Sequence, residues 1–453
     1  MNLKDKKVLI IGCGKSGIGA AGLLHQAGAN PVLFDAKTEL DVQKIKEKLT
    51  PGVCAEIVLG EVTEELRKQL SLVVVSPGVP TDTPFMKQFF DAGLPVWGEI
   101  ELAYQFGSGR VIAITGTNGK TTTTTLVGEI MKKYYESVFV VGNIGNPYTD
   151  AALSMGPDSV TVAEISSFQL ETVREFHPAV SAVLNITPDH LDRHHTMENY
   201  AAVKASVSKN QTAEDFCILN AEDPYTEEIA AKCRASVILL SSQRKLETGY
   251  YLDGDMICSR FGQKEEQLMN VHHMHLIGIH NYENVMAAIA VSAAFGVPMD
   301  VILETVKHFR AVEHRIEYVA EKKGVIYYND SKGTNPDAAI KAIRAMSRPT
   351  ILIGGGYDKQ NTYDEWIESF DGKVKLFVLI GQTREAIAAC ARAHGIENIV
   401  MADTFEEAMD ICVKNAMPGD AVLLSPACAS WGMFPNYEVR GQMFKEYVNG
   451  LEE

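Results

Sequence analysis

The sequence contains no apolar run of the roughly 20 residues needed to cross a bilayer. Its first residues, MNLKDKK, lead directly into a strand-like segment and lack the apolar core of a signal peptide. A cytoplasmic location is therefore expected. The 8 cysteines include no C-x-x-C pair, so we expect reduced thiols rather than disulfides or zinc ligands.

Positive charge is also scarce. Lys and Arg total 42 against 58 Asp and Glu, and the net charge is −16. General binding of nucleic acid is therefore not expected, and any anionic ligand needs local cationic loops. The stretch HHMH at residues 272–275 has no matching ligand cluster elsewhere in the sequence, so a structural or surface role is expected for it.

Short apolar runs alternating with helical segments fill the chain, which predicts an α/β fold with mainly parallel sheets. The length of 453 residues suggests roughly two to four domains, and we place three at residues 1–98, 99–311 and 312–453. The first contains the strand-like runs KVLIIG, PVLFDA, AEIVLG and LVVVSPG.

The second block has longer apolar runs, such as RVIAITG, SVTVAEIS and AVSAVLNI, which are typical of strands buried on both faces. A hairpin turn is expected at Asp253-Gly254, and a helix ending at Gly296. The third block opens with the hairpin-like YVAEKKGVIYYND and continues as a second doubly wound pattern. Within it, Thr404 and Glu407 predict a capping box.

A glycine loop follows the first strand-like run. Gly12, Gly14 and Gly17 open a helix, and Asp35 ends the next strand about 20 residues further on. This is a dinucleotide fingerprint, in which the helix N-terminus receives a pyrophosphate. A UDP-sugar also carries a pyrophosphate, so the loop fits either nucleotide, and a turn without a ligand remains an alternative. Lys15 and the segment SPG at residues 76–78 are expected to line the same crevice.

A second loop, ITGTNGKTTTTT at residues 114–125, lies between a strand and a helix. It has the form of a phosphate-binding loop, except that Ile114 stands where the usual pattern has its first glycine, so the loop is a shorter variant. Its backbone N–H groups would cradle phosphates, Lys120 would reach the β- and γ-phosphates, and the Thr121 hydroxyl would bind Mg²⁺.

The second loop resembles the G-T-N-G-K-[ST] loop of the Mur ligases and of their folylpolyglutamate synthase cousins, and the resemblance covers essentially the whole chain. Matching segments follow in order: GNIGNP (142–147), EISSFQL (164–170), NITPDHLDRH (185–194), HNYEN (280–284), EHR (313–315), NDSKGTNP (329–336) and SPACASW (425–431). The last two resemble the D-glutamate-adding branch of the family. One departure is Gly432, where that pattern has Asp.

The resemblance implies an ATP-dependent ligase that adds D-glutamate to UDP-N-acetylmuramoyl-L-alanine through an acyl phosphate, in peptidoglycan precursor synthesis. It implies a Rossmann-like UDP-binding domain, a central domain like the P-loop ATPases and a Rossmann-like C-terminal domain that binds the amino acid, in a monomer. Lys120, His190, Lys204 and Lys332 would be catalytic.

The same resemblance assigns the remaining site residues. Contacts to ATP would come from Gly116, Thr117, Asn118, Gly119, Lys120, Thr121, Thr122, Asn281, Asn284, Arg315 and Asp330. Contacts to the UDP-linked substrate would come from Ser16, Asp35, Lys37, Gly78, Asn143 and Ser166. D-Glutamate would meet Lys332, Thr334, Lys359, Ser430, Trp431 and Tyr437. Two Mg²⁺ ions would be held by Thr121, Glu164, His190 and Lys204, the last as a carbamate.

Other functions account for fewer of these motifs. A nicotinamide-dependent oxidoreductase would use the first loop and leave the second loop idle. A regulatory nucleotide-binding protein would have no need of Lys120, Glu164, His190 and Lys204, all of which are present. Another Mur-type ligase with a different acceptor amine is the nearest alternative.

Overall fold

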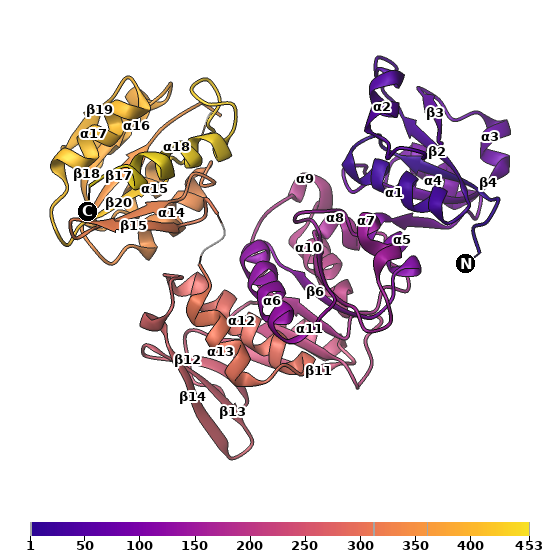
Figure 1. Ribbon diagram of the computed structural model, residues 1–453, viewed down its shortest axis with the longest axis horizontal. Coiled ribbons are helices and arrows are strands. Elements are labelled where there is room, and N and C mark those ends of the chain that lie inside the picture. Colours follow the sequence, from indigo (N-terminus) through magenta and orange to yellow (C-terminus); the bar gives the residue numbers. More distant parts are fainter. Residues whose placement is uncertain (1, 311–312, 360, 453) are drawn as a thin grey trace. The chain divides into compact units, whose positions relative to one another are not determined.

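The computed structural model describes residues 2–310, 313–359 and 361–452. Its strands form three sheets, which confirms the predicted α/β class (Figure 1). The chain divides into two compact units, Met1–Met269 with Glu283–Val306, and Asn270–Tyr282 with Lys307–Glu453. The boundary expected between residues 311 and 312 lies outside the described residues.

The first sheet has the strand order β3-β2-β1-β4-β5, and all of its pairings are parallel. This is the Rossmann order without its sixth strand, and its topological switch point lies between β1 and β4. The strands are β1 (Lys7–Ile11), β2 (Asn30–Asp35), β3 (Glu56–Leu59), β4 (Leu70–Val75) and β5 (Val96–Gly98). The helices are α1 (Lys15–Gln26), α2 (Val42–Lys48), α3 (Glu64–Gln69), α4 (Pro84–Asp91) and α5 (Glu99–Phe106).

The second sheet has the order β14-β13-β12-β11-β10-β9-β6-β8-β7. The strands are β6 (Arg110–Thr115), β7 (Val138–Gly142), β8 (Val160–Glu164), β9 (Val180–Val183), β10 (Phe216–Asn220), β11 (Ser236–Ser241), β12 (Gly249–Asp253), β13 (Met256–Phe261) and β14 (Lys264–Asn270). The helices are α6 (Lys120–Tyr134), α7 (Tyr148–Ala151), α8 (Ser167–Leu170), α9 (Leu191–His194), α10 (Met197–Ala205), α11 (Thr226–Lys232), α12 (Ile279–Phe295) and α13 (Met299–His308), with the 3-10 turns η1 (Ala152–Ser154), η2 (Ser206–Ser208) and η3 (Val271–His273).

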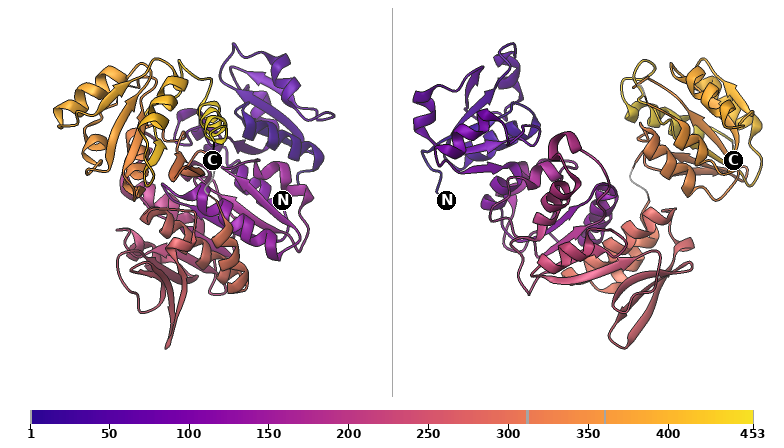
Figure 2. Two further views of the ribbon diagram at one scale, coloured as in Figure 1. Left: turned by 60° about the vertical axis from the view of Figure 1, so that its left-hand side comes forward. Right: turned by 180° about the vertical axis from the view of Figure 1, so that it is seen from behind.

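The antiparallel end of this sheet matches the expected turn. β12 pairs antiparallel with β13 around Gly254, which has φ 58°. The β13–β14 hairpin projects past the helices of its unit in every view (Figures 1 and 2). The predicted end of a helix at Gly296 is also found: Gly296 follows α12 and has φ 104°, as expected for a residue that ends a helix.

The third sheet has the order β15-β16-β20-β17-β18-β19, parallel except for the β15–β16 hairpin at its edge. The strands are β15 (Glu317–Lys322), β16 (Val325–Asn329), β17 (Thr350–Gly354), β18 (Val374–Leu379), β19 (Ile399–Met401) and β20 (Ala421–Leu424). The helices are α14 (Pro336–Ala345), α15 (Asp364–Glu368), α16 (Arg384–Ala393), α17 (Phe405–Asn415) and α18 (Tyr437–Asn449).

The predicted capping box of α17 forms only in part. The Thr404 hydroxyl accepts from the backbone N of Glu407 at 3.1 Å, as expected. The Glu407 carboxylate, however, accepts from the backbone N of Asp403 at 2.8 Å rather than from that of Thr404. The reciprocal bond is therefore displaced by one residue.

The first two sheets share one apolar core, to which β1 contributes Ile10 and β6 contributes Ala113. Two buried carboxylates on α5 add polar ties between the sheets. Glu99 accepts from the backbone N of Tyr148 at 2.8 Å, and Glu101 accepts from that of Arg174 at 2.7 Å. Because a buried carboxylate is stable only when its oxygens are satisfied, these bonds fix α5 against the second sheet.

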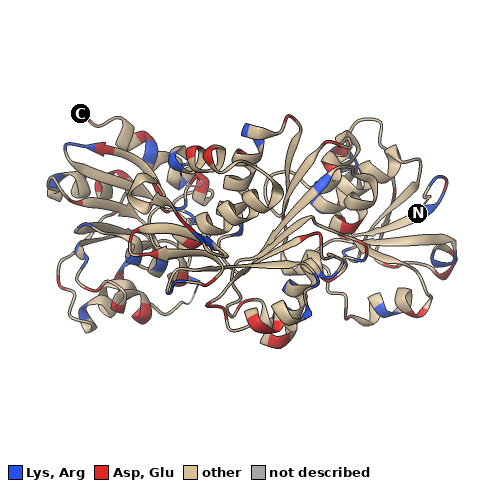
Figure 3. Cartoon of the chain, turned by 90° about the horizontal axis from the view of Figure 1, so that it is seen from below, with Lys and Arg blue, Asp and Glu red and all other residues tan. Residues whose placement is uncertain are grey.

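Charged side chains lie mainly on helices and loops, and most of the strand ribbon carries neither sign (Figure 3). This distribution matches the long apolar runs in the sequence, because parallel strands covered by helices are buried on both faces. Within the described parts of the chain, no helix combines the length and the apolar character that a membrane span requires. All 8 cysteines are free thiols.

Candidate active site

The carboxyl ends of β1 and β4 open into a cavity of about 500 Å³ at the switch point of the first sheet. Four of the residues expected to bind a UDP-linked substrate line it: Ser16, Asp35, Gly78 and Asn143. Two others, Lys37 and Ser166, do not. The backbone N of Lys37 donates to Asp35 at 3.1 Å, and Ser166 forms a capping box with Gln169 at the start of α8.

Glu99, which lines this cavity, has no counterpart in the sequence-based assignment, whereas Ser76 belongs to the segment SPG that was expected there. Glu99 is buried and accepts from Gln169 Nε2 at 3.2 Å and from Ser16 Oγ at 3.5 Å. Burial raises the pKa of the Glu99 carboxyl, against the lowering effect of these hydrogen bonds and the Tyr148 N–H. Ser76 Oγ is buried without a hydrogen-bond partner. Both are polar groups that a ligand in the cavity could engage.

The first glycine loop is held by Asp35. The backbone N of Cys13 donates to Asp35 Oδ2 at 3.3 Å, and Gly12 takes φ 104°. Gly17 lies so close to the loop that a Cβ there would stand 1.9 Å from the carbonyl oxygen of Gly12. Gly14, the N-cap of α1, makes no side-chain cap hydrogen bond, so the first N–H groups of α1 face the cavity without a side-chain acceptor at the cap.

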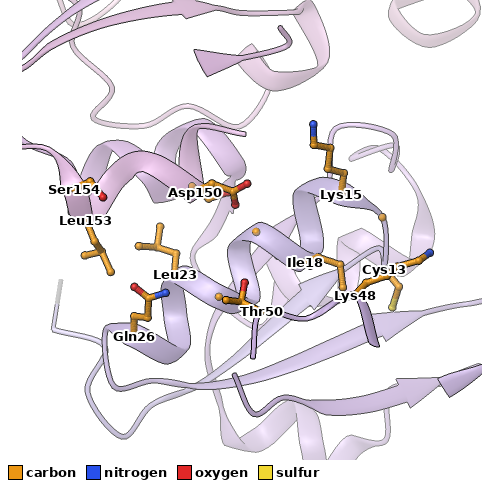
Figure 4. A pocket seen from close by; sticks show the side chains of 14 residues that line it. Cys13, Lys15, Ile18, Leu23, Gln26, Lys48, Thr50, Asp150, Leu153 and Ser154 are labelled. Carbon is orange, nitrogen blue, oxygen red and sulfur yellow. The ribbon is translucent and has the colours of Figure 1, made fainter. Parts of the chain in front are cut away.

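A second cavity, of about 600 Å³, lies on the other side of α1, between α1 and the α7–η1 segment (Figure 4). Lys15 lines both cavities, and its Nζ donates to the carbonyl of Gly145 at 2.8 Å. Thr149 and Asp150 face α1 at Gly19, where a Cβ would lie 2.6 Å from the oxygen of each side chain. None of the residues assigned above to a ligand lines this second cavity.

The phosphate loop follows β6 and opens α6. Ile114 is fully buried within β6, in register with Ala182 on one side and Glu164 on the other. The usual first glycine position is therefore a strand residue here, and the loop begins at Gly116, with φ 149°. Gly119 has φ 84° and caps α6 without a side-chain hydrogen bond, which leaves the helix N-terminus suited to an anion.

Neighbouring elements support the phosphate loop at several points. Asn185, after β9, accepts from the backbone N of Asn118 at 2.8 Å and donates to its carbonyl at 3.1 Å. Thr117 Oγ1 lies 3.2 Å from the Tyr200 hydroxyl. Asn284 of α12 packs against Gly119, where a Cβ would lie 2.1 Å from its Oδ1. Asn185 and Tyr200 were missed from the sequence because only side-chain contacts reveal them.

Two lysines converge on the loop. Lys120 Nζ donates to the carbonyls of Gly116 and Thr117, each at 2.9 Å. Lys204, on α10, is 1% exposed, and its Nζ donates to the carbonyl of Gly116 at 2.8 Å and lies 4.6 Å from the Tyr200 ring centroid. Burial, and after it the charge of Lys120, lowers the pKa of the Lys204 amine to about 7.

Glu164 ends β8, the strand beside the phosphate loop. Its Oε1 accepts from Asn143 Nδ2 at 2.8 Å, whereas its Oε2 is buried without a hydrogen-bond partner. A buried carboxylate oxygen with no protein donor is what a cation ligand requires before the cation binds. His190 has φ 52°, a half-exposed side chain and Nε2 at 3.4 Å from Asp189 Oδ2.

In the other unit, the carboxyl ends of β16 and β20 bring two sequence motifs together. Asp330 is buried, and its Oδ2 accepts from Ser425 Oγ at 2.7 Å. Burial raises the pKa of the Asp330 carboxyl to about 7, although the Ser425 bond and the charge of Arg315 oppose that rise. Arg440, which the sequence did not single out, is fully buried and donates to the carbonyls of Ser331 at 2.8 Å and Cys428 at 3.3 Å.

Residues expected to hold D-glutamate form two cation–ring pairs. Lys332 Nζ lies 5.4 Å from the Tyr437 ring centroid, and Lys359 Nζ lies 5.4 Å from that of Trp431. The backbone N of Thr334 donates to the carbonyl of Lys332 at 2.9 Å. Ser430 is buried and precedes the exposed Trp431.

Three further features from the sequence analysis can be placed: Gly432, Asn281 and part of the histidine-rich stretch. Gly432, where the family pattern has Asp, takes φ 88° and has open space around it. Asn281 lies one turn before Asn284 on α12 and donates from Nδ2 to the carbonyl of Ile277 at 2.8 Å. His272 and His273 of the histidine-rich stretch are exposed in η3.

Comparison with known proteins matches three family models along the chain. They are described as Mur ligase MurD-like, N-terminal domain (residues 6–98), Mur ligase middle domain (114–292) and Mur ligase, glutamate ligase domain (314–428). A relative from Lachnospira eligens, named UDP-N-acetylmuramoylalanine--D-glutamate ligase, is 59% identical over 451 residues and covers 100% of each chain. One of the same name from Lachnoclostridium phytofermentans is 56% identical over 453 residues, again with 100% of both chains covered.

A solved structure with the same fold is that of UDP-N-acetylmuramate-alanine ligase MurC from Thermotoga maritima. It superposes with a TM-score of 0.60 over 98% of this chain and 99% of that chain, at 17% sequence identity. At this identity the likeness shows agreement of the fold alone.

Proposed function

The chain belongs to the Mur ligase family, and on that premise we propose that it joins D-glutamate to UDP-N-acetylmuramoyl-L-alanine with consumption of ATP. The observation that carries the proposal is its full-length likeness to relatives named as D-glutamate ligases. The geometry supports the proposal, because each sheet has residues suited to one ligand at the carboxyl ends of its strands. These ligands are a nucleoside diphosphate, a polyphosphate and a dicarboxylate.

The reaction must activate a carboxylate toward an amine. A carboxylate oxygen of the UDP-linked substrate attacks the γ-phosphorus of ATP and ADP leaves, which forms an acyl phosphate. The amine of D-glutamate then adds to the acyl carbon, and the tetrahedral intermediate expels phosphate. Since the first step brings several anions together, positioning and positive charge are what the protein must provide.

Lys120 and the N-terminus of α6 provide the positive charge closest to the phosphates in this proposal. The backbone N–H groups of residues 116–122 cradle the β- and γ-phosphates, and Lys120 moves from its present carbonyl partners to the γ-phosphate. Asn284 lies beside Gly119, at the edge expected for the nucleoside of ATP. Arg315 and Asp330 are proposed to contact ATP, Asp330 at the ribose, and Asn281 and Asn284 to face the adenine.

The residues that would hold Mg²⁺ are Thr121, Glu164, His190 and Lys204. The fit rests on the buried, partnerless Oε2 of Glu164, since a hard cation prefers oxygen ligands. Mg²⁺ there would neutralise charge on the phosphates and on the substrate carboxylate. Asn143 holds Glu164 in place by its hydrogen bond to the other carboxylate oxygen.

Lys204 is proposed to carry a carbamate. Carbamate formation needs an unprotonated amine that attacks CO₂ and loses one proton, and burial favours that neutral amine. A cationic amine so close to Lys120 and to a metal would be repelled, whereas a carbamate offers anionic oxygens. The carbonyl of Gly116 would then lose its bond from the Lys204 amine and keep that from Lys120.

The UDP-linked substrate would occupy the cavity lined by Ser16, Asp35, Gly78 and Asn143. Lys37 and Ser166 do not line it and stay predicted contacts to that substrate. D-Glutamate would bind in the other unit through Lys332, Lys359, Thr334, Ser430, Trp431 and Tyr437. The paired cations suit its two carboxylates, and each lysine is held near an aromatic ring that limits its movement. We also propose domain boundaries after residues 98 and 311, a monomeric state and a cytoplasmic location.

The test is phosphate release by the purified protein with ATP, Mg²⁺ and UDP-N-acetylmuramoyl-L-alanine, in parallel reactions with D-glutamate, L-glutamate, L-alanine and a diamino acid. Turnover that depends on D-glutamate is expected. Faster turnover with L-alanine or the diamino acid would assign another branch of the family. Tight binding of NADH would instead favour an oxidoreductase.

A further inference from the structure

A cluster of metal-binding side chains lies where α15 packs against α16, outside the sites described above. Asp364 and Glu368 stand four residues apart on α15, and Cys390 and His394 stand four residues apart at the end of α16. Residues four apart lie on the same face of a helix, so each helix presents two ligand-type side chains to the other.

The atoms that could bind a metal are already close together. One ligand atom each from Asp364, Cys390 and His394 lies within 4.8 Å of the other two, the one such group of three found among residues 2–310, 313–359 and 361–452. His394 Nε2 is 3.1 Å from Asp364 Oδ1, and its Nδ1 is 3.9 Å from Glu368 Oε1. Metal–ligand bonds of about 2.0–2.3 Å place tetrahedral ligands about 3.3–3.8 Å apart.

The remaining adjustment is small for these side chains. The carboxylate side chains of Asp364 and Glu368 are each 63% exposed, and that of His394 is 26% exposed. Rotation of exposed side chains can therefore bring the ligand atoms to bonding distance while the helices stay in place.

The kinds of donor select the metal. A thiolate and an imidazole bind borderline metals such as Zn²⁺, whereas Mg²⁺ and Ca²⁺ take oxygen donors. We propose that Asp364, Cys390 and His394 form a binding site for Zn²⁺ or a similar divalent transition metal, with Glu368 near the other ring nitrogen of His394. On binding, the Cys390 thiol loses its proton to solvent and its sulfur becomes a ligand.

A metal bound at this site would link α15 to α16, and both helices begin beside the same buried thiol. The residue before each helix contacts the same thiol: the Tyr363 hydroxyl and Thr383 Oγ1 each lie 3.3 Å from Cys428 Sγ. Metal across the two helices would therefore fix the elements that border Cys428. The proposal is independent of the ligase reaction, because it concerns binding of a metal at residues to which no substrate is assigned.

Cobalt titration of the reduced full-length protein, with Mg²⁺ in large excess, tests the site. Co²⁺ bound to a thiolate absorbs by charge transfer, which oxygen-ligated Co²⁺ does not, so any Co²⁺ at Mg²⁺ sites stays silent in this measurement. We expect the absorption to saturate near one equivalent and Zn²⁺ to abolish it. Cys390→Ser should remove it, and His394→Gln should weaken binding at least about tenfold.

Two control variants distinguish binding at this cluster from adventitious binding of Co²⁺ to other cysteines and histidines. Cys54→Ser removes an exposed thiol elsewhere, and His177→Gln removes a histidine that pairs with Asp215 at 2.7 Å. Both should leave the titration unchanged. The proposal is overturned if wild type shows no thiolate absorption, or if Cys390→Ser and His394→Gln bind Co²⁺ as wild type does.

Discussion

The first two sheets each carry a glycine loop between a strand and a helix, yet different side chains surround the two loops. At the β1–α1 loop, Asp35 accepts from the loop backbone and Glu99 is buried in the same cavity. At the β6–α6 loop, Lys120 and Lys204 both donate to the carbonyl of Gly116. Both loops offer a helix N-terminus, so the neighbouring side chains distinguish their ligands.

Charge therefore predicts what each loop accepts. Carboxylates beside the first loop suit a ligand that also has hydroxyl or N–H donors, such as the ribose and base of a nucleotide diphosphate. The Lys120 cation and the N-terminus of α6 beside the second loop suit a polyphosphate, which presents acceptors only. A glycine fingerprint thus locates a phosphate site, whereas the neighbouring side chains indicate whether a sugar or a triphosphate is bound there.

The largest expected effect is that of Lys120→Ala. Loss of the cation at the γ-phosphate should lower kcat by about 10³-fold or more, because charge stabilisation dominates phosphoryl transfer. Phosphate release measures the loss, and calorimetry with the UDP-linked substrate should show unchanged affinity at the first loop. Equal weakening of both ligands would mean that the two loops are not independent.

Lys204→Met should lower activity by about 100-fold while nucleotide affinity is retained. In wild type, activity should fall when the enzyme is degassed and assayed in CO₂-free buffer and return on addition of bicarbonate. The same treatment should not change the residual activity of Lys204→Met. Full activity of the variant would contradict a ligand role for this side chain.

The pKa of the buried Lys204 amine predicts how the free energy of unfolding changes with pH in CO₂-free buffer. Its pKa is about 7 in the folded protein and 10.5 in the unfolded reference. Between these values the unfolded chain binds more protons, so the free energy of unfolding should rise with pH across this window. Urea denaturation at several pH values should show a smaller rise for Lys204→Met. An identical slope would mean that burial does not depress this pKa.

Strands and loops were predictable from the sequence because their signals are local. Apolar runs such as SVTVAEIS and AVSAVLNI became β8 and β9, and both glycine loops lie between a strand and a helix as expected. β14 was missed because its sequence, KEEQLMN, is mostly exposed and lacks apolar alternation. β5 has only 3 residues, too few for a pattern to register.

The residues that the sequence analysis missed depend on contacts between segments that lie far apart in the chain. Glu99 and Arg440 read in the sequence as ordinary charges, and only the fold buries them against Gln169 and against the Ser331 and Cys428 carbonyls. Lys37 was assigned to the UDP-linked substrate by the family resemblance. Its backbone caps Asp35, but its side chain does not line the cavity. The position of a residue along a strand predicts the edge of the sheet at which it lies. It does not predict the direction in which its side chain points.

Asp35→Ala tests whether the first loop binds the UDP-linked substrate independently of ATP. It removes a carboxylate from the cavity and an acceptor from the Cys13 N–H, so affinity for the UDP-linked substrate should fall about 10- to 100-fold. The ATP affinity should change little. Asp35→Asn keeps an acceptor for Cys13 and should lose less, which separates support of the loop from contact with the ligand. Weakened ATP binding in either variant would show coupling between the loops.

The smallest effect is expected for Gly14→Ala. A Cβ at Gly14 meets no atom within 4 Å, and φ is −80°, so the fold should change by less than about 1 kcal/mol. If a pyrophosphate approaches the N-terminus of α1 closely, the added methyl group should weaken the UDP-linked substrate several-fold and spare ATP. Gly22→Ala, at an equally open position inside α1, is the matched control, because it changes helix propensity without touching the loop. Thermal denaturation and calorimetry on both variants provide the two measurements. Equal substrate affinity in Gly14→Ala and Gly22→Ala would place the pyrophosphate away from this helix end and leave Asp35 and its neighbours as the means of recognition.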